Sequence, residues 1–339
     1  MASVKPAILH YVAAIATATP QLLNRAGYAS KLAYFGMLTA LAGPCDLTTS
    51  PDGAIWAEDI LVDEIARVDV NTGDVTEYDI PFTNGPVITT PEIASRGALA
   101  CAIQPGNDGM LYAASGIRNQ FVRINPTAKN IDVFTQTPFK PLGNLQPLND
   151  LWLGPTGMFF SQTTNNVILH FDYKTEEFTN WEVPTPLGGP VEIYYASDDG
   201  LRFCEFTGQK IGRLNATDGT FKEYPIPLTL LGPVVMRAET QGQYLWFAAF
   251  LANAIGRIDM YTREIDGDGN IRFSTATQNT LNNLTPSTGE ITTVQQPGTL
   301  LTAPISVPPA VDIATHYGPG NAIWFTEVAN NRIGRYNLD

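Results

Sequence analysis

The sequence predicts an all-β protein, a six-bladed β-propeller, with a seven-bladed ring as the alternative. Three observations lead to it: a twelve-residue motif that occurs six times, turn residues ahead of the copies, and the composition. Gly and Pro supply 29 and 25 of the 339 residues, while apolar residues make up 44% and charged residues only 16%. Many short strands joined by tight turns produce this composition. A chain of this length can also bury a large core.

The repeated motif defines the blades. Each copy but one opens on an aromatic residue, and each has a hydrophobic residue two positions before a final Arg or His. A Gly-containing turn such as SPDG, SDDG or GPGN precedes the motif, and an apolar strand such as VTEYDIP or FKEYPIP follows it. Four short strands in roughly 40–50 residues indicate one propeller blade. The six copies are WAEDILVDEIAR (56–67), YAASGIRNQFVR (112–123), FFSQTTNNVILH (159–170), RFCEFTGQKIGR (202–213), WFAAFLANAIGR (246–257) and WFTEVANNRIGR (324–335).

The chain is divided into a short N-terminal segment and one domain. Residues 1–28 are a candidate signal peptide, because an apolar stretch follows Lys5 and Ala-Thr-Ala at 16–18 resembles a cleavage site. His10 and Tyr11 interrupt this stretch. If residues 1–28 are a signal peptide, we expect the protein in the secretory pathway or outside the cell, and otherwise in the cytoplasm.

Residues 29–339 are predicted to form a single propeller domain with an insertion near 260–288. The stretch KLAYFGML (31–38) is typical of an outer strand. We expect it to pair with the last blade and close the ring, which would remove open sheet edges.

Charge and cysteine content exclude several classes of function. The net charge is −13 and no Lys/Arg cluster occurs, which argues against a nucleic-acid partner. No apolar run reaches the length of a membrane span. The three cysteines, Cys45, Cys101 and Cys204, are odd in number and far apart, so neither a disulfide framework nor a zinc site is expected. Small apolar molecules are the expected partners, and the oligomeric state is open.

Two sets of positions mark a candidate site. Inner strands line a propeller's channel, and sites usually lie where the connecting loops open at one mouth. The first set lies six residues before the hydrophobic residue of each motif ending: Asp59, Ser115, Gln162, Glu205, Ala249 and Glu327. The second lies at the start of each inner strand, with a one-residue shift left open in the third and fifth blades: Asp46, Ala102, Asn149, Glu192, Val235 and Asp312.

This arrangement predicts a mouth with acids on several sides and an apolar wall on one. Crowded carboxylates raise one another's pKa, so an acid here can donate a proton near neutrality. Polar residues at strand ends also occur only to satisfy backbone groups. The expected catalytic residues are Glu205, Glu327, Gln162 and Asp59. The expected substrate-binding residues are Asp46, Asn149, Glu192, Val234, Ala249, Phe250 and Asp312.

Four stretches resemble the streptogramin B lyase (virginiamycin B lyase) family: IWFTEVANNRIGRY, LWFAAFLANAIGRID, KIGRLNATDGTFKEYPIP and GPVEI. The resemblance runs from about residue 30 to residue 339 and implies seven blades, a magnesium ion and two histidines, each directly after the Pro of a GP turn. None of the matching residues here is His, which counts against the lyase reaction itself. Glu327 matches a family glutamate. The positions that match the histidines are Cys45, Cys101, Leu148, Val191, Val234 and Val311.

The chain also resembles lyase-like propellers of fungal secondary metabolism, among them hetero-Diels–Alderases of tropolone sesquiterpenoid pathways. This resemblance implies a cyclase that joins a tropolone quinone-methide-type diene to a terpene alkene of the humulene type, in meroterpenoid biosynthesis. Orientation of the two partners and one acid would suffice, so no cofactor and no metal are expected.

Two other functions stay open. A metal-dependent lyase or lactonase would hold Mg²⁺ or Ca²⁺ in the channel, and its cage would be formed by Asp46, Asn149, Glu192 and Asp312. A non-enzymatic binding propeller would instead hold a partner on its mouth.

Overall fold

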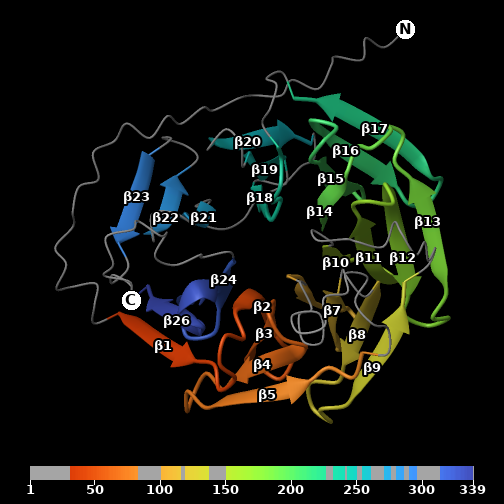
Figure 1. Cartoon of the computed structure of the whole chain (residues 1–339). Helices are drawn as coiled ribbons and strands as arrows, with labels where there is room; N and C mark the ends of the chain where they lie inside the picture. Colours follow the sequence, from red (N-terminus) through yellow and green to blue (C-terminus); the bar gives the residue numbers. More distant parts are fainter. Residues whose placement is uncertain are drawn as a thin grey trace, which may run out of the picture. The chain divides into compact units, whose positions relative to one another are not determined.

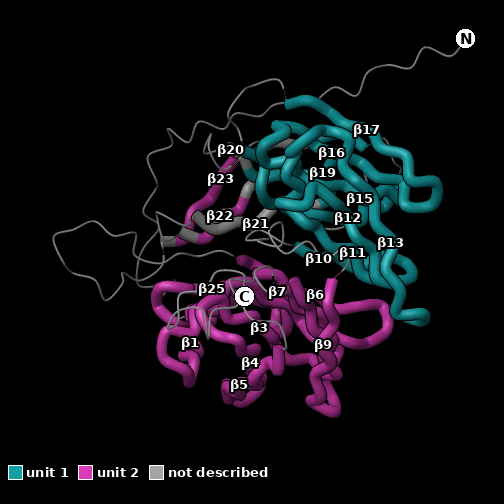
Figure 2. The backbone as a smooth tube through the Cα atoms, turned by 45° about the vertical axis from the view of Figure 1, so that its right-hand side comes forward, with its two compact units in different colours: residues 1–17, 148–270 teal, residues 18–147, 271–339 magenta. Residues whose placement is uncertain are grey.

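A computed structural model describes residues 31–82, 101–115, 119–136, 150–226, 232–240, 243–249, 254–260, 271–275, 280–285, 290–295 and 314–338. These residues form β-strands joined by turns, with one short 3-10 helix, η2 (Val328–Asn330). They fall into two compact units, one within residues 148–270 and the other within residues 18–147 and 271–339 (Figure 2). No helix in the described ranges is long and apolar enough to cross a membrane.

The unit within residues 148–270 contains three antiparallel sheets, each in simple up-and-down order. The strands of the first are β10 (Leu151–Leu153), β11 (Gly157–Gln162), β12 (Val167–Asp172) and β13 (Phe178–Glu182). Those of the second are β14 (Pro190–Tyr195), β15 (Leu201–Glu205), β16 (Lys210–Asn215) and β17 (Thr220–Pro225). The third has three strands, β18 (Ala238–Thr240), β19 (Tyr244–Ala249) and β20 (Ala254–Asp259).

The other unit contains four sheets (Figure 1). Two are up-and-down: β2 (Pro44–Thr49), β3 (Ile55–Asp59), β4 (Glu64–Val68) and β5 (Val75–Asp79); and β6 (Ile103–Pro105), β7 (Leu111–Ser115), β8 (Gln120–Ile124) and β9 (Ile131–Thr135). A three-stranded sheet holds β21 (Ile271–Thr275), β22 (Thr280–Thr285) and β23 (Glu290–Gln295). In the fourth, β1 (Leu32–Gly36) lies beside β26 (Arg332–Asn337), followed by β25 (Ala322–Glu327) and β24 (Thr315–Gly318).

The described residues thus form seven sheets, and the expected count of six blades is not confirmed. The additional sheet comes from the region near 260–288, which was predicted to be an insertion. Two of its stretches are β21 and β22, which form a sheet with β23. This sheet has no copy of the twelve-residue motif, so the motif count misses it.

The N-terminal strand pairs as the sequence predicts. β1 runs antiparallel to β26, with Leu32 opposite Tyr336 and Gly36 opposite Arg332. Phe35 stacks on Trp324 at 5.4 Å between ring centroids. The first described strand therefore completes the sheet formed by the last three.

Burial follows strand position within each sheet. The second strands, such as β3, β11 and β25, are buried at every residue, whereas the fourth strands β5, β9 and β13 contain only half-buried and exposed residues. A short continuous apolar run is typical of a strand covered on both faces. The apolar cores accordingly lie between successive sheets, as where Trp56 of β3 and Ile103 of β6 share one cluster.

The motif residues have structural roles. Gly212 and Gly334 lie opposite Phe203 and Phe325, and a Cβ added at either glycine would come within 2.1 and 2.2 Å of that ring. Glycine is therefore needed opposite these two rings, whereas other copies of the motif have Ala66, Val122 and Leu169 at the same position. The motif Arg pairs with the Asp of the preceding turn, and the Nε of Arg67 lies 2.9 Å from the Oδ2 of Asp52.

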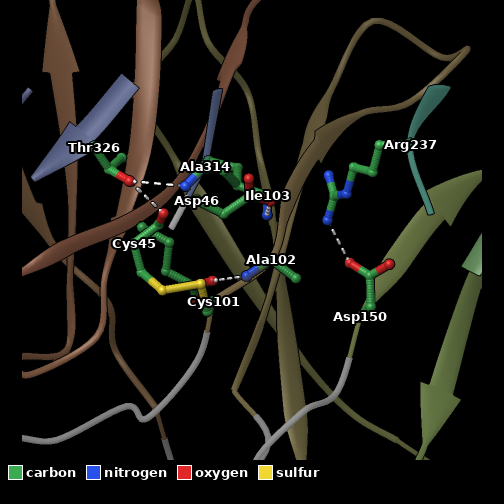
Figure 3. Close-up of a disulfide and its surroundings, with 10 residues drawn as sticks. Cys45, Asp46, Cys101, Ala102, Ile103, Asp150, Arg237, Ala314 and Thr326 are labelled. Carbon is green, nitrogen blue, oxygen red and sulfur yellow. Dashed lines mark hydrogen bonds and ion pairs between the residues drawn. A yellow bond between two sulfur atoms is a disulfide. The ribbon is translucent and has the colours of Figure 1, made fainter. Parts of the chain in front are cut away.

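A buried hydroxyl joins neighbouring sheets. The Oγ1 of Thr326 donates to the backbone oxygen of Cys45 at 2.8 Å and accepts from the N–H of Ala314 at 3.1 Å (Figure 3). In the other unit, Ser161 makes the same two bonds, to Val191 and Asp150. The motif thus supplies a hydrogen bond between sheets as well as within one.

We expect Thr326→Val to lower the free energy of unfolding by about 1–3 kcal/mol, because it leaves a buried and a half-buried backbone group without their partner. The hydroxyl is lost while the volume is nearly kept. Urea unfolding measures the effect, with Thr76→Val on the exposed side of β5 as the control. Equal stability of both variants would show that the hydroxyl contributes nothing.

Candidate functional site

The four expected catalytic residues occupy equivalent places at the ends of second strands. Asp59 ends β3 and Glu327 ends β25 in one unit, while Gln162 ends β11 and Glu205 ends β15 in the other. All four side chains are fully buried. The sequence motif therefore located these four residues correctly at strand ends. Their side chains are buried, however, and not exposed at the mouth of a channel.

Asp59 is a buried acid without a hydrogen bond. Neither of its carboxylate oxygens has a partner. Burial, followed by the charges of Glu77 and Glu64, raises the pKa of Asp59 to about 8. The adjacent Glu58 is also fully buried, and its Oε2 accepts the N–H of Ala102 at 2.9 Å.

Glu205 is the matching acid in the other unit, and neither of its carboxylate oxygens has a hydrogen-bond partner. A Cβ added at Gly188 or Gly208 would come within 2.8 or 2.5 Å of its Oε2, so the backbones of both glycines lie against the carboxylate. Burial, followed by the charge of Glu223, raises the pKa of Glu205 to about 7, although Lys210 opposes the shift. This acid holds its proton in a large fraction of molecules at neutral pH.

Glu205 makes stability depend on pH. Because its folded-state pKa of about 7 exceeds the ordinary value of 4.5, its contribution is complete below 4.5 and is lost as pH rises through about 7. The loss is on the order of 3 kcal/mol at most. Unfolding measured between pH 4.5 and 8 should show a steeper decline for the wild type than for Glu205→Gln, whose side chain cannot ionise. Parallel curves would contradict the raised pKa.

Glu327 and Gln162 already have partners. The Oε2 of Glu327 accepts from the Nδ2 of Asn330 at 2.8 Å and from the Nε of Arg332, whereas its Oε1 has none. Gln162 accepts from the Nδ2 of Asn165 at 2.9 Å. These contacts make both residues better suited to hold the strand ends than to donate a proton.

The inner-strand acids form bonds between sheets. Asp46 accepts the N–H of Ile103 at 3.0 Å (Figure 3). Asp150 makes the equivalent bond to the N–H of Ile193 at 3.1 Å. The third blade therefore places Asp150 where Asn149 was expected, which is the one-residue shift that the sequence left open. Asn149 and Asp312 lie outside the described residues.

Arg237 is a site residue that the motif count missed. Its Nη2 lies 2.8 Å from the Oδ1 of Asp150, its Nε lies 3.1 Å from the Oε2 of Glu192, and its guanidinium lies over Trp152. Glu192 is thus engaged by a cation, which argues against its place in the expected metal cage. Arg237 follows the GP turn of its repeat by only a few residues, and that proximity was the available signal.

The apolar wall is described only in part. Val234 is half-buried and its N–H bonds the backbone oxygen of Ala248 at 3.0 Å, while Val235 is 39% exposed. Ala249 ends β19. The side chain of Ala249 and the whole of Phe250 lie outside the described residues. Two adjacent valines at this turn are consistent with an apolar surface there.

The expectation of no disulfide is wrong. Cys45 and Cys101 are bonded, with their Cα atoms 5.2 Å apart, whereas Cys204 is free and buried. The two bonded cysteines occupy equivalent positions, one at the start of each of two successive sheets. Their separation of 56 residues hid the pairing, because sequence distance does not show that neighbouring sheets bring their inner strands together.

These residues do not fit the magnesium site that the family resemblance implies. Two of the positions that match its histidines are joined in the Cys45–Cys101 disulfide, and a third is the buried Val191. Glu327, which matches the family glutamate, is paired with Arg332. The histidines of the described part pack elsewhere: His316 lies 2.8 Å from the Oγ1 of Thr49, and His170 packs on Phe159.

Comparisons with known proteins agree with the architecture. Residues 149–267 match the model of the virginiamycin B lyase family. A solved streptogramin B lyase structure is similar with a TM-score of 0.72 and 20% identity, over 91% of this chain and 97% of that one.

More distant structures are similar as well. The RRP9 WD40 repeats align with a TM-score of 0.65 and 6% identity, over 91% and 98% of the two chains. The extracellular domain of a putative hybrid two-component system from B. thetaiotaomicron gives 0.60 and 12%, over 90% of this chain and 39% of that one. No curated protein matches this chain. The chain therefore has an all-β, propeller-type fold of the kind seen in streptogramin B lyase.

Proposed function

We propose that the protein is a small-molecule cyclase. It catalyses an intermolecular hetero-Diels–Alder cycloaddition between a tropolone quinone-methide-type diene and a humulene-type terpene alkene, in the biosynthesis of fungal meroterpenoids. The resemblance to lyase-like propellers of fungal secondary metabolism supports the substrate class. The observation that carries the catalytic role is Glu205, a buried acid with a pKa of about 7 and no hydrogen-bond partner.

The proposed chemistry needs one donor and no redox partner. The exocyclic carbon and the oxygen of the quinone methide form two new σ bonds to the alkene carbons, and no atom leaves. Protonated Glu205 donates a hydrogen bond to the tropolone oxygen, which lowers the energy of the diene's acceptor orbital. General-acid assistance of this kind is worth about 10²–10⁴-fold.

Among the four predicted catalytic residues, Glu205 and Asp59 both have a raised pKa and no hydrogen-bond partner. Glu205 is preferred because its sheet packs against the one that follows Val234 and Val235. Glu327 is ion-paired and Gln162 is hydrogen-bonded, whereas Glu205 is unpaired and keeps its proton near neutrality. Because its carboxylate is fully buried, a substrate oxygen reaches it only if the turns that carry Gly188 and Gly208 move aside. Glycines at both places leave no side chain to block that movement.

The terpene would be held on the valine turn. Val234 and Val235 precede β18 and hydrogen-bond through their backbones to Ala248 of β19, in the sheet next to that of Glu205. Met236 and Val191 share one apolar cluster. Contact with a hydrocarbon is favoured at roughly 25 cal/mol per Å² of apolar surface removed from water. Holding the alkene against the diene then supplies proximity and orientation.

The test is an assay of the full chain with a quinone-methide precursor and a humulene-type alkene. We expect cycloadduct to form faster, and with more of one stereoisomer, than in heat-denatured protein. Val234→Trp should suppress turnover by filling the proposed terpene site. A rate and stereochemistry equal to the uncatalysed reaction would contradict the proposal. Activity that disappears in chelator would favour a metal-dependent lyase or lactonase.

A further inference from the structure

Three carboxylates converge in the sheet of β2 to β5. Asp59, Glu64 and Glu77 each offer one oxygen, and the three oxygens lie within 4.8 Å of one another. Asp59 is fully buried with both oxygens unpartnered, and the Oε2 of Glu64 is also buried without a partner. Among the described residues, no Lys, Arg or His forms an ion pair with any of the three.

The equivalent place in two other sheets contains a cation. Glu205 lies directly opposite Lys210, and Glu327 lies directly opposite Arg332. The Nζ of Lys210 is 2.6 Å from Glu223, which occupies the same strand position as Glu77. In the sheet of Asp59, the place of Lys210 is taken by an acid, Glu64.

In the other sheets that contain the motif, the last residue of the second strand and its cross-strand partner have no net charge between them. Where the second strand ends in a neutral residue, its cross-strand partner is neutral too, as in the pairs Gln162–Val167, Ser115–Gln120 and Ala249–Ala254. An acid with a cation, or two neutral residues, is thus the rule in five sheets. The Asp59 sheet departs from it because Glu64 stands where the cation is expected, so that Asp59, Glu64 and Glu77 lie together without one in the described part of the chain.

We propose that Asp59, Glu64 and Glu77 bind a hard divalent cation of the Ca²⁺ or Mg²⁺ class. Carboxylate oxygens are the preferred ligands of such ions, at about 2.3–2.6 Å for Ca²⁺ and 2.0–2.1 Å for Mg²⁺. One Ca²⁺ can therefore bridge oxygens up to about 5 Å apart, a span that covers the observed cluster. The ion takes the electrostatic role that Lys210 and Arg332 have elsewhere.

The site links two stretches of the chain. Glu77 also accepts the N–H groups of Leu38 and Thr39, at 2.6 and 2.8 Å. These residues lie between β1 and β2, so the ion would fix the connection between the sheet that contains β1 and the sheet of β2 to β5. The proposal is independent of the catalytic role of Glu205, which lies in the other unit.

The test is calorimetric titration of chelator-treated full-length protein with Ca²⁺ and, separately, Mg²⁺. We expect one ion per chain, and a rise in Tm of roughly 3–4 °C at a concentration near 100 Kd. Asp59→Asn should weaken binding at least 10-fold. Glu64→Lys, which copies the Lys210 arrangement, should abolish binding and raise the Tm of the ion-free protein.

Glu182→Gln, an exposed outer-strand acid on β13, is the matched control and should bind as the wild type does. Two results would overturn the proposal. The first is that neither ion binds the wild type, which would mean that the three acids share protons instead. The second is that Glu64→Lys binds the ion with unchanged affinity. If Glu64→Lys does not fold, Asp59→Asn with unchanged affinity is decisive.

Discussion

Replacing Glu205 by Leu is expected to slow the proposed cycloaddition by about 10²–10⁴-fold. Leucine has no carboxyl group but a volume similar to that of glutamate, so the apolar packing around this position changes little. Glu205→Gln should retain part of the rate, because an amide N–H also donates a hydrogen bond but is a weaker acid. The measurement is kcat with saturating diene and alkene, at a pH where the protein is folded.

The pH profile separates catalysis from folding. Wild-type kcat should fall as pH rises through about 7, because Glu205 loses the proton that it donates; the profile of Glu205→Gln should be flat over the same range. Circular dichroism at each pH checks that the fold persists. Glu182→Gln serves as the control. A wild-type rate that is unchanged in Glu205→Leu would remove this residue from the mechanism.

Removal of the Cys45–Cys101 disulfide is expected to lower the free energy of unfolding by about 4 kcal/mol. The bond closes a loop between cysteines that are 56 residues apart, and the loss of chain entropy in the unfolded state grows with loop length. For a protein of this size the corresponding decrease in Tm is roughly 5–6 °C. The double variant Cys45→Ala with Cys101→Ala should show it in thermal and urea unfolding.

Reducing agent provides the control for the disulfide. Dithiothreitol should bring the wild type close to the double variant and should leave the double variant unchanged, because Cys204 is free in the described structure. Mass spectrometry of peptides prepared without reduction identifies the bond directly. If the two proteins unfold alike under oxidising conditions, the disulfide does not contribute to stability. Disulfides persist mainly in oxidising compartments, so this result also bears on where the protein resides.

The sequence by itself determined the local architecture. The motif length fixes two strands and the turn between them. The pairing of β1 with β26 was also predictable, because an unpaired outer strand at one end needs a partner. The register located Glu205 and Asp59 correctly at strand ends.

Only the tertiary structure decided which residues of different repeats meet. Cys45 finds Cys101 because successive sheets bring their inner strands together. Asp150 and Glu192 share Arg237 for the same reason. Spacing within one repeat is fixed by strand geometry, whereas contacts between repeats depend on how sheets pack.

The same distinction applies to the charges around the candidate acids. Asp59 and Glu205 occupy the same register position, and the ninth residue of their motif copies differs, because it is Glu64 in one and Lys210 in the other. Their surroundings differ because Lys210 faces Glu205 across the strand pair, while Glu64 occupies the equivalent place beside Asp59. The sequence thus determined where the acids lie and which residue stands at the ninth motif place. The folded structure determined that Glu77 and Glu223 of the outer strands come close to them, because electrostatic neighbours are set by distance in space and not along the chain.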